Sequence, residues 1–101
     1  RLDIAAPEQE AYNLPFATAI RQVVSCPLMS VGGMRSYAVA TRSLETVDYI
    51  AMARPLIREP ELPLRWQRGE RETARCISCN GCFKPGLKEG GIRCVLEEQQ
   101  P

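Results

Sequence analysis

The sequence predicts an α/β fold assembled from parallel βα units. Between residues 13 and 51, apolar positions with helical spacing alternate with short apolar runs, in the order helix, strand, helix, strand. The two predicted strands are separated by roughly 20 residues, a spacing that suits βα units. Such an alternation is typical of either a closed barrel or an open doubly wound sheet, and the periodicity alone does not choose between them.

The first helix and the first strand are predicted from residues 13–24 and 27–31. Residues 13–24 place apolar side chains on one helical face, with Asn13 as the candidate N-cap. Residues 27–31 form a mostly apolar run that stops at Gly32 and Gly33. We therefore expect a buried strand that ends in a flexible loop.

The second βα unit follows the same order. Ser36 is suited to cap a helix over residues 37–44, and residues 46–51 are rich in strand-forming side chains. Pro55 is placed to begin another helix directly after that strand. A further helical stretch is predicted to end at Gly69.

The chain is expected to divide after this last helix, into residues 1–69 and residues 70–101. Within the second part, residues 76–94 have few periodic apolar positions and contain Pro85, Gly86 and Gly90, so this segment is predicted to be a loop shaped by its ligands.

Composition narrows the class of protein. The chain has 101 residues, 45% of them hydrophobic and 25% charged, which is ordinary for a globular domain. Its formal net charge of +1 offers no field that would recruit nucleic acid or an anionic membrane. The sequence shows neither an apolar run long enough to span a bilayer nor a leader pattern, so the expected location is the cytoplasm. Because the first residue is Arg1, inside an amphipathic segment, we expect a piece of a longer protein.

Cysteine carries the strongest chemical signal. The chain has five cysteines and no histidine, which removes Cys-His zinc sites and histidine-based catalysis from this stretch. Four cysteines form the pattern C-x2-C-x2-C-x11-C; they are Cys76, Cys79, Cys82 and Cys94. Four thiolates in such a loop suit the corners of an iron–sulfur cubane. A four-cysteine zinc site and free or disulfide-linked thiols are the competing interpretations. Cys26 stands apart and is predicted to be a small buried hydrophobic residue.

Two loops that follow the predicted strands carry features of anion sites. The glycines Gly32 and Gly33 allow close approach to the backbone, and Ala53 and Arg54 combine N–H donors at a helix start with a guanidinium. The last two strands of a (β/α)8 barrel commonly provide such a phosphate site. A tight turn and a surface cation are the alternatives, and Arg35 is expected to be solvated.

Three motifs in order resemble the old yellow enzyme family, in its branch related to 2,4-dienoyl-CoA reductase and trimethylamine dehydrogenase. They are VGGMRS at 31–36, DYIAMARPLIREPELP at 48–63 and CISCNGC at 76–82. The family's reductase pattern places three residues between the second and third cysteines, whereas this chain has only Asn80 and Gly81.

The resemblance implies the last two βα units of a TIM (β/α)8 barrel, followed by a Cys-rich iron–sulfur loop. It implies that Gly32, Gly33, Ala53 and Arg54 hold the phosphate of FMN, and that the four clustered cysteines hold a [4Fe-4S] cluster. NAD(P)H would supply the electrons, and the substrate would be a small molecule such as an enoyl compound or another electron-poor alkene. The substrate-activating residues and the proton donor would lie on earlier strands, so no residue of this chain is expected to be catalytic.

Such a chain would need the remainder of the barrel or a homo-oligomeric partner, and it would be inactive alone because two strands cannot close a barrel. The alternative function is a small independent four-cysteine module, with zinc or an iron–sulfur centre, for electron transfer or protein contacts. A third interpretation is a structural fragment without a cofactor, whose exposed strands would promote association.

Overall fold

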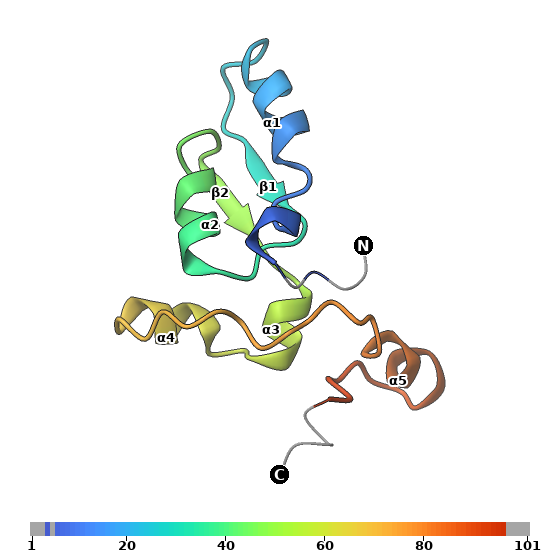
Figure 1. The fold of residues 1–101 in the computed structure, drawn as a ribbon. Helices are drawn as coiled ribbons and strands as arrows, with labels where there is room; N and C mark the ends of the chain where they lie inside the picture. The colour runs from blue at the N-terminus through green and yellow to red at the C-terminus, as the bar shows by residue number, and fades with distance from the viewer. Residues whose placement is uncertain (1–3, 5, 97–101) are drawn as a thin grey trace.

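The computed structural model describes residue 4 and residues 6–96. Its elements in chain order are the 3-10 turn η1 (Pro7–Gln9), α1 (Leu14–Arg21), β1 (Met29–Val31), α2 (Tyr37–Ser43), β2 (Tyr49–Ala51), α3 (Arg54–Arg58), α4 (Leu62–Gln67) and α5 (Phe83–Lys88). Figure 1 shows two tiers: the strands with α1 and α2 above, and α3, α4 and α5 below. The predicted alternation of helices and strands is confirmed in this part of the chain.

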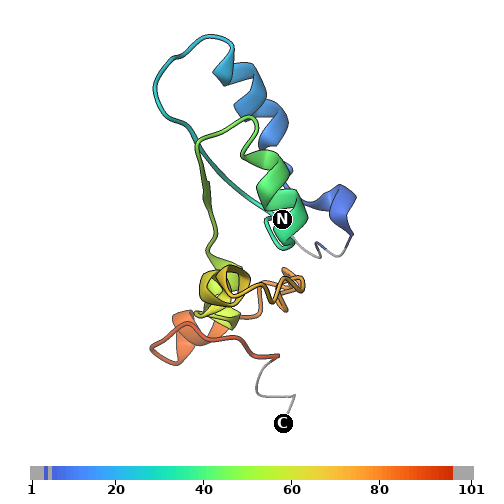
Figure 2. The same ribbon diagram turned by 90° about the vertical axis from the view of Figure 1, so that its left-hand side faces the viewer.

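The two strands pair in parallel, with Ser30 opposite Ile50. Figure 2 shows α1 and α2 on the same side of this sheet. Ser30 is buried, whereas its neighbours Met29 and Val31 are 63% and 50% exposed. The prediction of a buried strand is therefore wrong for these two residues, because the alternation of side chains along a strand turns them to the opposite face from Ser30.

The two predicted caps have different outcomes. The Ser36 hydroxyl accepts a hydrogen bond from the Val39 N–H at 3.3 Å, so the cap of α2 is confirmed. The Asn13 side chain does not cap α1. Its Nδ2 instead donates to the carbonyl oxygen of Val31 at 2.8 Å, which ties the start of α1 to the end of β1.

Hydrogen bonds of Asp48 and Arg21 hold the loop between α1 and β1 in place. Asp48 Oδ2 accepts from the Leu28 N–H at 2.9 Å and from Arg21 Nη1 at 3.0 Å. These contacts, the Leu28 N–H first, lower the pKa of Asp48 below its usual 3.8. Arg21 Nη2 also donates to the carbonyl of Cys26 at 2.7 Å. Cys26 itself is exposed, so its predicted burial is wrong: it lies in this loop, before β1 begins at Met29.

The core consists of two apolar clusters that share a partly buried residue, Met52. The buried members of the first are Ala40, Leu62, Trp66 and Ala74, and those of the second are Ala11, Met34 and Val39. The Tyr37 and Trp66 rings meet edge to face with centroids 5.7 Å apart. Since Ala74 comes from the segment after α4, the cysteine-containing part of the chain is packed onto the βα units.

The prediction that residues 76–94 form a loop is wrong at α5. This helix contains both Pro85 and Gly86. Pro85 falls in the first turn, where a backbone N–H has no helical partner to lose. A Cβ on Gly86 would meet Ile92 Cγ1 at 2.7 Å, so this glycine lets the returning chain pack against the helix.

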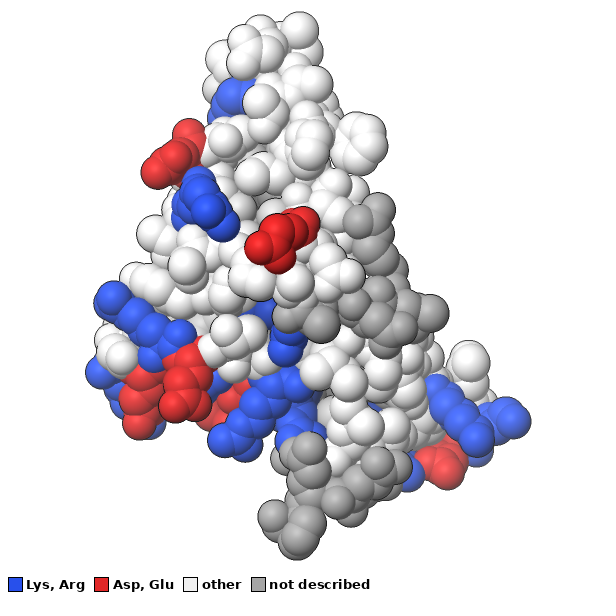
Figure 3. Space-filling model, in the orientation of Figure 1, with Lys and Arg blue, Asp and Glu red and all other residues white. Residues whose placement is uncertain are grey.

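Charge is unevenly distributed over the face seen in Figure 3. Lys and Arg side chains mix with Asp and Glu over the lower tier, while the upper part around α1 is mostly uncharged. Within residues 4 and 6–96, no helix combines the length and apolar character needed to cross a bilayer.

Candidate functional site

The two predicted anion loops line one hollow at the ends of the strands. The space at this hollow, including the open solvent at its mouth, is about 420 Å³. Its lining residues are Tyr12, Val31, Gly32, Gly33, Met34, Ala51, Met52, Ala53, Arg54, Pro55 and Ser78. We call it the glycine hollow. The structure thus brings together Gly32, Gly33, Ala53 and Arg54, the four residues implied by the resemblance, because parallel strands end at the same edge of the sheet.

Both glycines of this hollow are required by their surroundings. Gly32 has a φ of 124° and Gly33 has a φ of 70°. Residues with a Cβ rarely adopt backbone conformations with such positive φ angles. A Cβ on Gly32 would meet Asn13 Nδ2 at 2.7 Å, and one on Gly33 would meet the Tyr12 ring at 2.9 Å. The absent Cβ atoms therefore let the Tyr12 ring lie directly against this turn of backbone.

The electrostatics of the glycine hollow suit an anion. Arg54 is the one cation among its lining residues, and Tyr12 and Ser78 are the lining residues that carry hydroxyl groups. None of the lining residues just named is an Asp or a Glu. A phosphate group could accept hydrogen bonds from these side chains without facing a carboxylate.

We expect Gly33→Ala to lower the free energy of unfolding of the complete protein by about 1–3 kcal/mol for the backbone strain, with a further loss from displacement of Tyr12. Gly69→Ala is the matched control, because Gly69 also has a positive φ of 94° but a Cβ there meets no atom within 4 Å. Chemical denaturation measures the free energy of unfolding of each variant. Both losses include backbone strain, so the difference between them gives the contribution of the clash with Tyr12. A Gly33→Ala variant no less stable than Gly69→Ala would contradict the tight contact with Tyr12.

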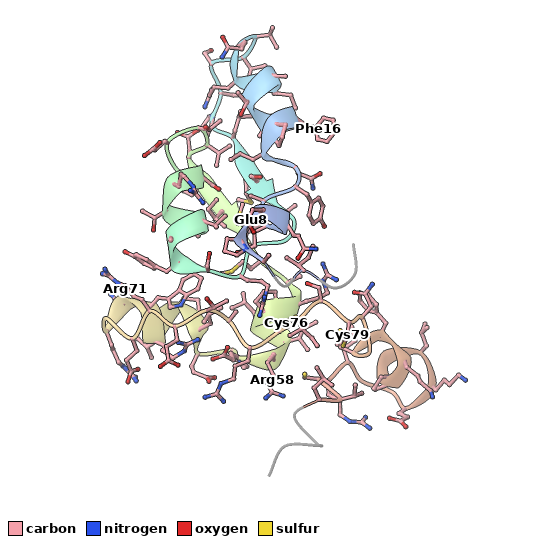
Figure 4. All side chains as sticks on the ribbon, viewed as in Figure 1. Glu8, Phe16, Arg58, Arg71, Cys76 and Cys79 are labelled. Carbon is pink, nitrogen blue, oxygen red and sulfur yellow. The ribbon has the colours of Figure 1, made fainter. Side chains whose placement is uncertain are left out.

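All four clustered cysteines line a second hollow, next to α3. The residues around it are Arg54, Ile57, Arg58, Cys76, Ile77, Cys79, Cys82, Cys94, Val95 and Leu96. We call it the cysteine hollow. Figure 4 shows Arg58 on α3 and labels Cys76 and Cys79 on the segment beyond α4. Apart from the cysteines and the two arginines, the lining is aliphatic, which suits a site that excludes water.

The backbone of this segment turns its N–H groups toward sulfur. The Ser78 N–H donates to Cys76 Sγ at 3.4 Å, and the Gly81 N–H donates to Cys79 Sγ at 3.5 Å. Ser78 and Asn80 have positive φ angles of 60° and 63°, which produce these tight turns between the cysteines. Successive N–H groups in such turns form a concave surface that favours negatively charged sulfur.

The protonation of Cys82 reflects its surroundings. Burial raises the pKa of the Cys82 thiol, nearby Cys76 and Cys79 raise it further, and the Arg54 guanidinium opposes them. Cys76, Cys79 and Cys82 all line the cysteine hollow. Among the residues that the structure describes, however, no three Cys, Asp or Glu side chains are gathered as ligands of one metal ion. The assignment of the four cysteines as metal ligands stays a prediction.

Arg35 fastens the cysteine segment to the βα units, and the prediction that it is a solvated side chain is wrong. Its guanidinium donates to the carbonyl oxygens of Ile4, Ala74 and Cys76 at 2.9, 3.1 and 2.6 Å. Its own N–H donates to Glu10 Oε1 at 2.6 Å. Arg35 lies two residues after Gly33 and contacts the carbonyl of Cys76, so one residue couples the positions of the two hollows.

Glu59 provides a second anchor for the same segment. Its buried carboxylate forms an ion pair with Arg65 at 3.1 Å and accepts from the Arg75 N–H at 2.8 Å. Trp66 Nε1 adds a hydrogen bond to the carbonyl of Glu72 at 3.1 Å. The backbone just before Cys76 is thus held at Arg75 by Glu59 and at Glu72 by Trp66.

Several residues of the site have no signal of their own in the sequence. Tyr12 and Ser78 line the glycine hollow from distant segments, and Glu10 accepts from the N–H groups of Arg35 and Ser36. Only Arg58 carried a detectable hint: it lies one helical turn after Arg54, so both side chains project from the same face of α3.

The chain is similar in sequence to segments of redox enzymes. It is 36% identical to a 4,4'-dithiodibutanoate disulfide reductase of Rhodococcus erythropolis, over 91% of this chain and 23% of that protein. It is 33% identical to an NADH oxidase of Thermoanaerobacter brockii, over 74% of this chain and 12% of the relative. A metal reductase of Desulforamulus reducens is 32% identical over 82% of this chain and 13% of its own length.

The chain therefore spans less than a quarter of the length of these three curated relatives. No family model matches it, and no solved structure matches it significantly.

Proposed function

We propose that this chain is part of an NAD(P)H-dependent oxidoreductase of the old yellow enzyme type, to which it contributes the FMN phosphate site and the ligands of a [4Fe-4S] cluster. The observation that carries the proposal is that Arg54 lines both hollows. A phosphate in the glycine hollow and a cluster in the cysteine hollow would lie on two sides of one guanidinium. Sharing one arginine makes the two proposed cofactor sites neighbours in the same chain, as expected of a protein that binds a flavin and a cluster together.

In the glycine hollow, Arg54 and the backbone of Gly32 and Gly33 would hold the phosphate, with Ala53 at the edge of the same site. The Ser78 hydroxyl is suited to add a hydrogen bond. FMN, when bound, supplies the hydride chemistry, and the protein supplies its position and electrostatic environment. The donor set fits an anion because the lining brings together a cation, a hydroxyl and glycine backbone without a carboxylate.

In the cysteine hollow, Cys76, Cys79, Cys82 and Cys94 would be the ligands. The N–H groups directed at two of these sulfurs and the aliphatic lining fit an electron-rich cluster. An iron–sulfur centre exchanges single electrons, which complements the hydride chemistry of a flavin.

The barrel itself is part of the proposal. Helices α1 and α2 cover the same face of the two-stranded sheet and leave the other face open (Figure 2). On that open face Met29, Val31 and Tyr49 are about half exposed or more. We propose that further strands, from the rest of a longer polypeptide or from a homo-oligomeric partner, cover these side chains and complete a (β/α)8 barrel.

The similar proteins support the reaction class. Their names describe two reductases and an NADH oxidase, all redox enzymes much longer than this chain. We therefore propose NAD(P)H as the electron donor and a small electron-accepting molecule, such as an electron-poor alkene, as the substrate. The comparisons do not favour an independent four-cysteine module, because the alignment with the disulfide reductase runs through most of this chain and not only its cysteine segment.

The test is the cofactor content of the complete protein, purified without oxygen. We expect about one FMN and four iron atoms per polypeptide, with broad visible absorption from the cluster under the flavin bands. Zinc in place of iron, with no flavin, would favour the small metal-binding module. Iron without flavin would remove the glycine hollow from the proposal, and protein without any metal or flavin would overturn it.

A further inference from the structure

Arg58 lies at the end of α3 with its side chain in the cysteine hollow. Its Nη1 stands 3.6 Å from Cys94 Sγ, within the range of a hydrogen bond to sulfur. The residue is only 8% exposed, and none of the motifs that indicate a cofactor site assigns it a role. Arg54 enters the same hollow from one turn earlier, so α3 presents two guanidinium groups to the four cysteines.

A guanidinium in this position favours negative charge on a centre bound by the cysteines. Taking an arginine out of water is costly unless it meets negative charge and hydrogen-bond acceptors, and a coordinated thiolate provides both. The adjacent carboxylate of Glu59 forms an ion pair with Arg65 and accepts from the Arg75 N–H. Arg58 therefore places positive charge at Cys94, whereas backbone N–H groups donate to Cys76 and Cys79.

We propose that Arg58 tunes the reduction potential of the cluster through its hydrogen bond to Cys94, an inference that rests on the proposed iron–sulfur function. Reduction adds one electron, and hence negative charge, to the cysteine-bound centre. A cationic N–H donor at a ligand sulfur stabilises that state more than the oxidised one, so it raises the potential. Arg58 is thus a positioning and charge-setting residue and not a ligand.

The test compares Arg58→Gln and Arg58→Lys with the wild type in the complete protein. The cluster is titrated with dithionite, which supplies the electron, in the presence of redox mediators. The reduced cluster is followed by its electron paramagnetic resonance signal, which distinguishes it from the flavin. Arg68→Gln is the matched control, since it removes the same charge from an exposed position outside the lining of the cysteine hollow.

We expect Arg58→Gln to keep its iron and to lower the equilibrium constant for reduction about tenfold, which corresponds to about 59 mV for a one-electron couple. Arg58→Lys, which keeps the charge, should remain closer to the wild type, and Arg68→Gln should match it. An unchanged potential in iron-loaded Arg58→Gln would overturn the inference while leaving the proposed function intact. Loss of iron from both Arg58 variants would also overturn it, because Arg58 would then be needed to bind the cluster. A wild-type protein without iron would instead refute the proposed function.

Discussion

Replacing Cys79 with serine in the complete protein is expected to remove most of the bound iron. A serine hydroxyl is a much poorer ligand for iron than a thiolate, and three remaining thiolates leave one corner of a cubane open. The change also deprives the Gly81 N–H of its sulfur acceptor, so the turn between Cys79 and Cys82 loses a contact that shapes it. Iron analysis and visible absorption of anaerobically purified protein measure the effect.

The matched control is Cys26→Ser. Cys26 is exposed in the loop between α1 and β1 and does not line the cysteine hollow. We expect this variant to retain the iron content of the wild type. Equal iron in the Cys79→Ser and wild-type proteins would remove Cys79 from the ligand set, and iron loss from Cys26→Ser would show that the fifth cysteine had been wrongly excluded.

The second large effect is expected from Arg54→Ala, which should weaken FMN binding at least about tenfold. A charge-assisted hydrogen bond to a phosphate contributes about 1.5–3 kcal/mol, and removing the guanidinium takes the only cation out of the residues that line the hollow. The dissociation constant of FMN can be measured by flavin fluorescence after the bound flavin has been removed. Arg68→Ala, at an exposed site, should leave it unchanged.

Arg54 also contacts the cysteine segment, so a second variant is needed to separate its two roles. Its Nη1 donates to Asn80 Oδ1, in the turn between Cys79 and Cys82. Asn80→Gly removes that acceptor but tolerates the positive φ of 63°. If Arg54 binds phosphate directly, Asn80→Gly retains FMN affinity close to that of the wild type. Equal losses in the two variants would assign the effect of Arg54→Ala to a disordered cysteine loop.

The elements of the fold could largely be predicted because their signals are local. The 3.6-residue pattern identified α1, and the hydroxyl of Ser36 marked the start of α2 within a single turn. The helix α5 was missed, because Pro85 and Gly86 were interpreted as breakers without reference to their position in its first turns. The presence of the two strands was predicted better than their burial, since burial depends on which other segments cover each face of the sheet.

Sequence alone determined the residue types from which the site is built: the glycine pair, Arg54 after the second strand, and four cysteines at a spacing that suits a cluster. Only the tertiary structure decided how they are connected. Arg35 reaches the carbonyl of Cys76 across 41 positions of the chain, and Arg58 reaches Cys94 across 36. Contacts of that range leave no periodic or local trace, because they arise when packing through Ala74 and Met52 brings the cysteine segment against the βα units. The sequence thus specifies which chemical groups the site contains. That Arg54 lines both hollows follows only from the folded structure.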